Sequence, residues 1–551
     1  MKPDLGLGDD REVFEITQGD PTRSMERSSG VRLAEVMACL SMATDLGMGQ
    51  PVEFALRSCV LGVRLGARLG FDDVGLRGVY YQALLRYIGC NAGTDTLAAL
   101  FGDELVLRRV AATVDTGSTP QALAMLWRVM REARAGGGPL HLVRAMAEGL
   151  LTAPRVLQAE FAGHCEVAER LATRLGFEPA IVEALGQLYE RWDGRGLPHG
   201  IRGEAIAPAV RVVALAQDAL TFSRLGGVEA ATQVARERAG GAYDPRVAEA
   251  FITHAADLLA GLDDTPAWDV VLAMEPAPHV SLTEAQLDDA CAAVADFADL
   301  KSPYALGHSG RVGALAEGAA RRFGLPEGDA VTVRRAGLLH DVGQVGVTAA
   351  IWAKPGPLGD AEWERARLHP YYTERVLARS HTLASVGAIA ALHHERLDGS
   401  GYHRAAPASS LSPAARILAV ADAYDAIRSD RSHRPGRDAD VAADELRREA
   451  RAGRLDADAV AAVLAAAGHR VPGRPQLPAG LTAREIEVLR LVARGRSMKQ
   501  MAATLVIAEK TVDNHVQHIY SKIGVSTRAG ATLFAMERDL LGPDGVAGDE
   551  R

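Results

Sequence analysis

Residues that could bind metal ions recur in the second half of the chain, around an adjacent histidine and aspartate, His340 and Asp341. Each lies in or beside an apolar stretch, where an imidazole or carboxylate is costly unless it is paired or metal-bound. Such a ligand set suits iron, manganese or zinc better than magnesium. Two such ions would polarise a phosphate and generate a hydroxide nucleophile. The candidate ligands are His308, His340, Asp341, His369, His393, His394 and Asp422.

The alternative is that each histidine is an ordinary core or helix-end residue with its polar atoms satisfied. For any single histidine this is the more common case. Five histidines and two carboxylates in such settings are hard to explain together as coincidence. The set therefore predicts a metal centre.

Several segments resemble the HD-GYP family in order and spacing. They are residues 339–343, 354–358, 368–370, 393–402 and 419–426. Members of that family are all-helical phosphodiesterases that hydrolyse cyclic di-GMP at a centre of two or three metals. The resemblance covers residues 300–468 and implies metal-dependent phosphodiesterase activity.

The resemblance also implies roles for individual residues. One metal would take His308, His340, Asp341 and Asp422, and the other would share Asp341 and take His369, His393 and His394. Tyr304 stands where some relatives have a glutamate that adds a third metal, so we expect two divalent ions. The catalytic positions would be Asp341 and Gln344, and the substrate-binding ones Asp425, Arg431 and Arg434. Guanidinium groups match phosphate oxygen atoms, although a pair of solvated surface arginines is an alternative.

Two positions depart from the family pattern. Gln344 replaces a lysine, so it can donate a hydrogen bond but supplies no charge, and His403 replaces the proline of the Gly-Tyr-Pro sequence. The first hypothesis is an enzyme that hydrolyses cyclic di-GMP or a related phosphodiester. The second is a regulator whose metal site binds a nucleotide as a non-hydrolysing sensor, and Gln344 favours this reading.

The elements that must position these residues occur twice. Residues 57–89 resemble residues 311–343 with a shift of 254 positions, and residues 189–196 resemble residues 394–401 with a shift of 205. The shifts differ by 49, so the first copy carries an insertion of that size between Gly93 and Glu160. Two copies of one helical domain explain this pattern.

The first copy has lost the candidate ligands, because only His164, which matches His369, remains. One imidazole cannot hold a metal pair, so we expect this copy to be inactive. It would serve as a dimerisation or packing scaffold, with ligand binding or regulation of the second copy as alternatives. The other matched positions hold Phe54, Arg86, Tyr87, Leu188, Tyr189 and Gln217.

The C-terminal residues predict a further set of short helices. Capping boxes begin at Thr482 and Ser497, a third helix is expected over residues 509–523, and Ser526 is expected to cap a fourth. This order is typical of a helix-turn-helix unit. Residues 481–540 carry nine Lys/Arg against six Asp/Glu in a chain with a net charge of −9, which favours contact with phosphate over a merely solvated face.

The same residues closely resemble the LuxR-type DNA-binding domain over residues 478–540. The resemblance implies transcriptional regulation through binding of a homodimer to DNA. Lys510, Thr511, His515 and Lys522 would contact the major groove. The serine that usually precedes the recognition helix is Ala508, which removes a helix cap worth about 1 kcal/mol.

The length of 551 residues exceeds what one core normally holds. We predict an all-α protein with two helical HD-type domains in tandem followed by a four-helix LuxR-type domain. The expected segments are a lead-in at residues 1–29, an inactive domain at 30–275, a metal-binding domain at 282–470, a proline-rich linker at 471–480 and a DNA-binding domain at 481–545.

The cysteines, the N-terminal residues and the lengths of the apolar runs indicate where in the cell the protein is located. Five scattered cysteines without a Cys-x-x-Cys pair indicate buried thiols in a reducing compartment. The N-terminal residues lack the features of a signal peptide, and no apolar run approaches 18 residues. We therefore expect a cytoplasmic protein without membrane contact.

Overall fold

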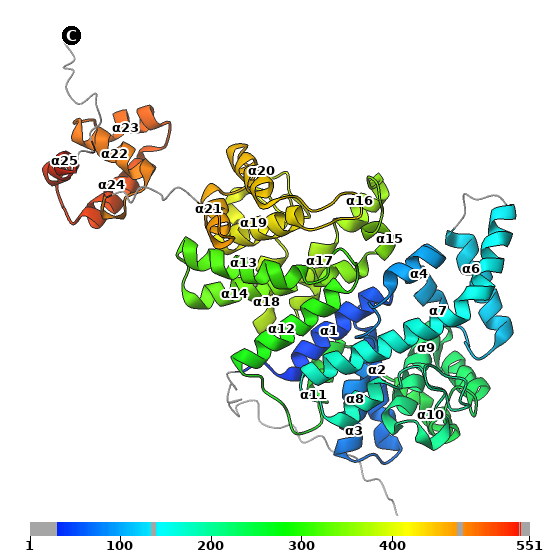
Figure 1. Cartoon of the computed structure of the whole chain (residues 1–551). Helices are drawn as coiled ribbons and strands as arrows, with labels where there is room; N and C mark the ends of the chain where they lie inside the picture. The colour runs from blue at the N-terminus through cyan, green and yellow to red at the C-terminus, as the bar shows by residue number, and fades with distance from the viewer. Residues whose placement is uncertain (1–29, 134–138, 471–477, 539, 541–551) are drawn as a thin grey trace, which may run out of the picture. The chain divides into compact units, whose positions relative to one another are not determined.

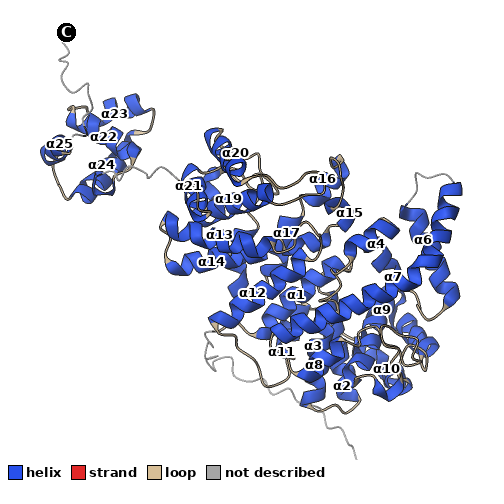
Figure 2. Ribbon diagram, in the orientation of Figure 1, coloured by secondary structure: helices blue, strands red, loops and turns tan. Residues whose placement is uncertain are grey.

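A computed structural model of the protein describes residues 30–133, 139–470, 478–538 and 540. In these ranges the chain forms α-helices and short 3-10 helices and no strands, apart from isolated bridges (Figure 2). The all-α prediction is thereby confirmed. The chain divides after His469 into two compact units, the first of which contains both HD-type copies.

The helices of the first copy begin beyond residue 30. They are α1 (Leu33–Gly47), α2 (Phe54–Arg68), α3 (Asp73–Leu85), α4 (Thr94–Phe101), α5 (Glu104–Ala111), α6 (Thr119–Ala133), α7 (Pro139–Arg174), α8 (Pro179–Leu185), η1 (Gly203–Ala205), α9 (Pro208–Arg238), α10 (Pro245–Leu259) and α11 (Ala267–Ala273). The insertion predicted between Gly93 and Glu160 corresponds to α4, α5, α6 and the first part of α7. In Figure 1, α4 lies beside α15 (Ala349–Trp352) of the second copy, with which it is in contact.

The second copy repeats this order without the insertion. Its helices are α12 (Glu284–Asp299), α13 (His308–Phe323), α14 (Glu327–Leu339), η2 (Val342–Gly346), α15 (Ala349–Trp352), α16 (Asp360–Ala366), α17 (His369–Leu377), α18 (His381–Ala390), η3 (Ala408–Ser410), α19 (Pro413–Arg428), α20 (Ala439–Arg451) and α21 (Ala457–Ala466). Ser412 caps α19 by accepting a hydrogen bond from the amide of Ala415, and Pro413 fits the first helical position.

Equivalent positions of the two copies make the same contacts. The Asp45 carboxylate accepts a hydrogen bond from the amide of Ala55, and Asp299 accepts one from the amide of Ser309, both at 3.0 Å. Matching ion pairs join Arg211 to Asp244 at 2.8 Å and Arg416 to Asp456 at 3.0 Å. The repeat seen in the sequence is thus also a repeat of structure.

The segment between the copies is attached to the start of α1. The amide of Leu33 donates to the carbonyl of Val280, and the amide of Leu282 donates to the carbonyl of Val31, each at 2.8 Å. In addition, α1 packs against η2 and α17 of the second copy. The two copies therefore share one continuous packed structure.

The second compact unit contains η4 (Pro478–Gly480), α22 (Ala483–Ala493), α23 (Met498–Leu505), α24 (Glu509–Ile523) and α25 (Arg528–Glu537). Both predicted capping boxes are present, at Thr482 and Ser497, and Ala508 provides no side-chain cap for α24. The cap of α25 is Thr527, which accepts from the amide of Gly530, and not Ser526 as expected. No described helix is both long and apolar enough to cross a membrane.

Candidate metal centre

The candidate ligands converge on one buried region, mostly from helix ends. A helix end lets a polar side chain turn toward a common point while the helix body packs in the core. The residues are His308 at the start of α13, His340 and Asp341 between α14 and η2, His369 at the start of α17, His393 and His394 after α18, and Asp422 within α19.

Asp341 lies between two groups of histidines. Its Oδ2 is 3.4 Å from Nε2 of His340 and 3.8 Å from Nε2 of His308. Its Oδ1 is 3.3 Å from Nε2 of His369 and 3.5 Å from Nε2 of His393. Each carboxylate oxygen therefore faces a different group, which is the arrangement that a bridging ligand requires.

Asp422 lies across the cluster from Asp341. Its Oδ1 is 3.3 Å from Nε2 of His308, and its Oδ2 is 3.6 Å from Nδ1 of His394. Three groups of potential ligands can be distinguished, and within each group the ligand atoms lie within 4.8 Å of one another. The groups are His308, His340 and Asp422; His340, Asp341 and His393; and His369, His393 and His394.

The orientation of three imidazoles is set by the backbone. The Nδ1 atoms of His340, His369 and His393 lie 2.8, 2.7 and 2.6 Å from the carbonyl oxygen atoms of Gly337, Ala366 and Ala390. This hydrogen-bond network assigns the proton to Nδ1 and leaves the Nε2 lone pair directed into the cluster.

The inward nitrogen atoms fit metal ions better than they fit one another. Nε2 of His369 and Nε2 of His393 are 3.0 Å apart, although both Nδ1 atoms already carry the proton. Nε2 of His340 is buried and makes no hydrogen bond. A divalent ion would satisfy these lone pairs, so the donor set fits the metal centre that the sequence predicted.

The electrostatics of the cluster also favour cation binding. Burial would raise the pKa of Asp341, but His340, His369 and His393 outweigh it and hold that pKa well below its usual range. Burial, together with neighbouring imidazoles, lowers the pKa of His393 to about 3. Asp341 is therefore ionised and His393 neutral near pH 7, as metal ligation requires.

Asp425 orients a candidate ligand instead of facing the cavity. Its Oδ2 accepts a hydrogen bond from Nδ1 of His308 at 2.7 Å, and Arg311 donates to both carboxylate oxygen atoms at 2.8 and 3.0 Å. The substrate contact of Asp425, which the family resemblance implies, stays a prediction. Burial opposes the charge on His308, but Asp422, Asp425 and Asp341 outweigh it and raise the pKa of the imidazole to about 10.

A cavity of about 760 Å³ opens beside the cluster. Arg431 lines it, and its side chain makes no hydrogen bond or ion pair with another described residue. Arg434 also lines it, but its guanidinium donates to the backbone carbonyl groups of Ala426, Ile427, Ser429 and Pro435, so that it mainly holds the turn that carries Arg431.

Gln344, which is predicted to be a catalytic position, lines the same cavity. Its Nε2 donates to the carbonyl of Ala298 at the end of α12, at 3.1 Å. One of the two amide hydrogen atoms of Gln344 is therefore already used in a hydrogen bond to the backbone.

Aromatic residues form a cavity wall that sequence reasoning missed. Trp352, Trp363 and Tyr402 line the cavity, and the Tyr402 ring lies 4.6 Å from that of His394. The guanidinium of Arg367 lies over the rings of both Trp363 and Tyr402. A tryptophan two positions before Lys354 of the family-like segment was the available signal for this wall.

The matched region of the first copy is closed by its own side chains. His164 lies 3.0 Å through Nε2 from the carbonyl of Ala92 and 3.3 Å through Nδ1 from the hydroxyl of Tyr189, which replaces His394. Burial lowers the pKa of His164 to about 4. None of the potential metal-binding groups among the described residues includes a residue of this copy.

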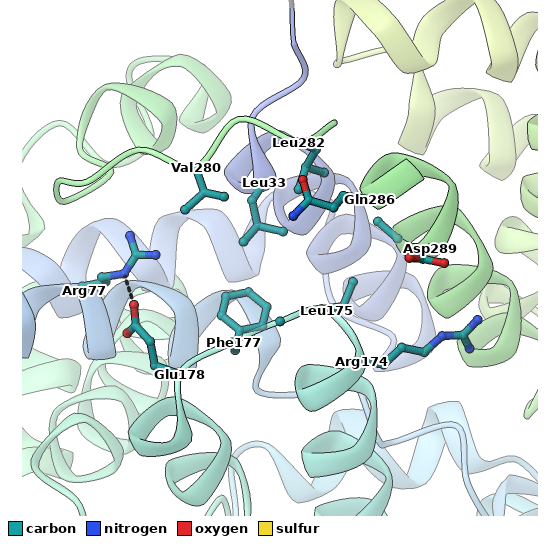
Figure 3. A pocket seen from close by; sticks show the side chains of 12 residues that line it. Leu33, Arg77, Arg174, Leu175, Phe177, Glu178, Val280, Leu282, Gln286 and Asp289 are labelled. Carbon is teal, nitrogen blue, oxygen red and sulfur yellow. Dashed lines mark hydrogen bonds and ion pairs between the residues drawn. The ribbon is translucent and has the colours of Figure 1, made fainter. Parts of the chain in front are cut away.

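A smaller cavity of about 200 Å³ lies at the junction of the copies, between α1, α3, α12 and the turn after α7 (Figure 3). Its two arginines are already paired, Arg77 with Glu178 and Arg174 with Asp296. It contains none of the candidate ligands.

In the C-terminal unit, Lys510 and Thr511 are exposed on α24, and His515 is half-buried one turn further on. The ammonium of Lys522, for which a DNA contact is predicted, pairs with Glu485 at 2.8 Å and donates to the carbonyl of Gly480 at 3.2 Å. These contacts fasten α24 to the start of α22.

Comparison with known proteins identifies relatives of both units. Residues 155–247 and 292–459 match the HD domain, and residues 479–535 match the bacterial regulatory proteins of the luxR family. A 3'3'-cGAMP-specific phosphodiesterase of Vibrio cholerae is 32% identical over 406 residues, which cover 73% of this chain and 87% of the relative. A cyclic di-GMP phosphodiesterase of Pseudomonas aeruginosa is 40% identical over 134 residues, covering 24% of this chain and 32% of the relative.

A crystal structure of a cyclic GMP-AMP-specific phosphodiesterase of Vibrio cholerae superimposes with a TM-score of 0.54 and 27% identity, over 80% of this chain and 99% of that one. A probable transcriptional regulatory protein, NarL, of Mycobacterium tuberculosis is 51% identical over 61 residues, covering 11% of this chain and 28% of the relative. The chain therefore belongs to the HD-GYP-type family of HD-domain phosphohydrolases, with a degenerate first copy and a LuxR-family domain at its C-terminal end.

Proposed function

We propose that this protein hydrolyses a cyclic dinucleotide in the cavity beside the histidine cluster and that its C-terminal unit binds DNA. The observation that carries the first part is Asp341, whose two oxygen atoms face two separate histidine groups at 3.3–3.8 Å. Relatives that act on 3'3'-cGAMP and cyclic di-GMP support this class of substrate.

The proposed cofactors are two divalent ions of iron, manganese or zinc. His308, His340, Asp341 and Asp422 would hold one, and Asp341, His369, His393 and His394 the other. When bound, such ions supply a polarised phosphate and a water of lowered pKa. The protein's own contribution is a fixed set of imidazoles, which Asp425 and backbone carbonyl groups hold in place.

Substrate would be held by the other residues that line the cavity. The guanidinium of Arg431, which pairs with no residue in the described part of the chain, suits a phosphate oxygen, and Arg434 positions it through the turn. Gln344 would add a neutral contact where relatives of this family carry a lysine. The aromatic wall of Trp352, Trp363 and Tyr402 would exclude water and contact the bases.

The non-hydrolysing sensor is the less supported reading. Gln344 is the only candidate residue that favours it, whereas all seven candidate ligands are brought together and the relatives are phosphodiesterases. A loss of charge at one position reduces activity without removing the metal centre.

The test uses the purified full-length protein. Bound metal is measured by elemental analysis, and hydrolysis is followed for 3'3'-cGAMP, cyclic di-GMP and the generic diester bis(p-nitrophenyl) phosphate. Asp341→Ala is expected to lose metal and activity, whereas Tyr87→Phe at the matched position of the first copy is expected to retain both. Metal-replete wild-type protein that hydrolyses none of the three would overturn the proposal.

For DNA, we assign the contacts to Lys510, Thr511 and His515, and we give Lys522 a structural role because Glu485 holds it. We propose that the protein binds as a homodimer, and the similarity to LuxR-family regulators supports this. An operator selected from random duplexes should lose affinity with Lys510→Ala and Thr511→Ala at unchanged helicity, and light scattering should show two chains per duplex. The described cysteines are all buried free thiols, in keeping with a cytoplasmic location.

A further inference from the structure

A buried contact joins the inserted helices of the first copy to the second copy. Glu104, in the first turn of α5, and Lys301, just after α12, form an ion pair of 2.7 Å in which both side chains are 0% exposed. The same carboxylate accepts hydrogen bonds from Oγ1 of Thr348 at 2.7 Å and from the amide of Ala349 at 2.9 Å. One carboxylate of the inactive copy thus holds three groups of the other.

The hydrogen bonds that Glu104 accepts from Thr348 and Ala349 fix the start of α15. Thr348 precedes this helix but provides no side-chain cap of its own, and Glu104 supplies the acceptor instead. At the other end of α15, Trp352 lines the cavity. Its Nε1 donates to the carbonyl of Gln344 at 3.3 Å, and its ring lies 5.7 Å from the ring of His369. A shift of α15 would therefore move a cavity wall that touches a candidate ligand.

The ion pair with Lys301 fixes another part of the cavity lining. Lys301 leads directly into Ser302 and Tyr304, which line the cavity. Its carbonyl accepts a hydrogen bond from Oγ1 of Thr94, at the start of α4, at 3.1 Å. The insertion therefore contacts two segments that contribute residues to the cavity lining.

The ion pair itself does not explain this arrangement, because apolar residues of similar volume often replace a buried pair without loss of stability. Burial would raise the pKa of Glu104, but Lys301, Thr348 and Ala349 outweigh it and keep the carboxyl ionised. What an apolar residue cannot supply is an acceptor for the hydroxyl of Thr348 and the amide of Ala349. The acceptor, and not the charge, is the part that shapes the cavity.

We propose that Glu104 is a positioning residue for the active copy, so that the insertion in the inactive copy sets the shape of the substrate cavity. This rests on the proposed function, since it concerns the cavity in which the cyclic dinucleotide would bind. It gives the degenerate copy a role in substrate discrimination beyond packing.

A matched pair of double variants in the full-length protein isolates the acceptor. Glu104→Gln with Lys301→Met removes both charges and keeps an oxygen that can accept from the amide of Ala349, while the new side-chain amide nitrogen can donate to the hydroxyl of Thr348. Glu104→Leu with Lys301→Met removes the charges and the acceptor at similar volume. Both are assayed for bound metal, melting temperature, and kcat and KM on 3'3'-cGAMP, cyclic di-GMP and bis(p-nitrophenyl) phosphate.

We expect the glutamine variant to keep a KM near that of the wild type, and the leucine variant to raise KM for the preferred cyclic dinucleotide about tenfold. Activity on the generic diester and metal content should be equal in the two. Equal KM values for the dinucleotide in both variants, or an equal loss on every substrate, would overturn the proposal. Inactive wild-type protein would instead refute the proposed function, so the two failures are distinct.

Discussion

Replacing Asp425 distinguishes a residue that orients a metal ligand from one that binds substrate. Its carboxylate lies 2.7 Å from Nδ1 of His308 and accepts two hydrogen bonds from Arg311. A hydrogen bond to a charged group contributes about 1.5–3 kcal/mol. Since about 1.4 kcal/mol corresponds to a factor of ten, Asp425→Ala should weaken metal binding by about 10- to 100-fold.

The assay titrates metal-free protein with Mn²⁺ or Zn²⁺ against a chromogenic chelator. Hydrolysis is then measured at saturating metal, where the loss of rate should be largely restored because His308 is again held by its ion. Arg311→Met serves as the control, since it removes the other partner of Asp425 and leaves the bond to His308 in place. It should change metal affinity much less.

One result would refute this reasoning. If Asp425→Ala binds metal with the affinity of the wild type and raises KM for the cyclic dinucleotide, Asp425 contacts the substrate, as the family resemblance first implied. The 2.7 Å contact with His308 would then be without consequence for the metal centre.

Further perturbations test other parts of the structure. Gly343→Ala should lower the free energy of unfolding by about 1–3 kcal/mol or more, because a Cβ there would lie 2.1 Å from a backbone oxygen of α17; Gly310→Ala, with nothing within 4 Å, should be neutral or stabilising in urea denaturation. Lys522→Ala should destabilise the C-terminal unit by about 1 kcal/mol in thermal unfolding. Lys510→Ala should leave stability unchanged and reduce the slope of log affinity against log salt by about one, and an unchanged slope would argue against a phosphate contact. Burial would raise the pKa of Glu485, but Lys522 and Thr482 outweigh it and lower that pKa. The ionised Glu485 carboxylate therefore stabilises the fold above the ordinary glutamate pKa, and this contribution is lost as pH falls through the lower pKa of the folded state. The melting temperature should consequently fall less steeply with decreasing pH in Glu485→Gln than in the wild type. Removal of metal by a chelator should abolish hydrolysis and lower the melting temperature of the first unit, and re-addition of Fe²⁺, Mn²⁺ or Zn²⁺ should reverse both; a melting temperature that does not respond would contradict the metal centre.

The sequence by itself determined which residues can hold metal and which copy has kept them. Metal ligation requires imidazole and carboxylate groups, and few other residue types can replace them, so His340 and Asp341 stand out against Arg86 and Tyr87 of the first copy. Helix caps such as Thr482 were equally legible, because a capping box depends only on residues within one turn.

The tertiary structure decided what the polar residues around the centre do. Asp425 contacts His308 across 117 positions of sequence, and Lys522 contacts Glu485 across 37. The residue types were visible beforehand, but a charged side chain on a helix can face substrate, solvent or another residue. Only the packing of the helices selects among these partners.

Glu104 is the clearest example of a residue whose contacts could not be predicted from the sequence. Nothing near it in the sequence marks it out, and its partners Lys301 and Thr348 lie 197 and 244 positions away. Such a contact forms only when the insertion of one copy packs on the other, because burial makes an unpaired carboxylate too costly and so fixes its partners. The sequence determined the chemistry of the metal centre, whereas only the tertiary structure decided which parts of the chain hold it in shape.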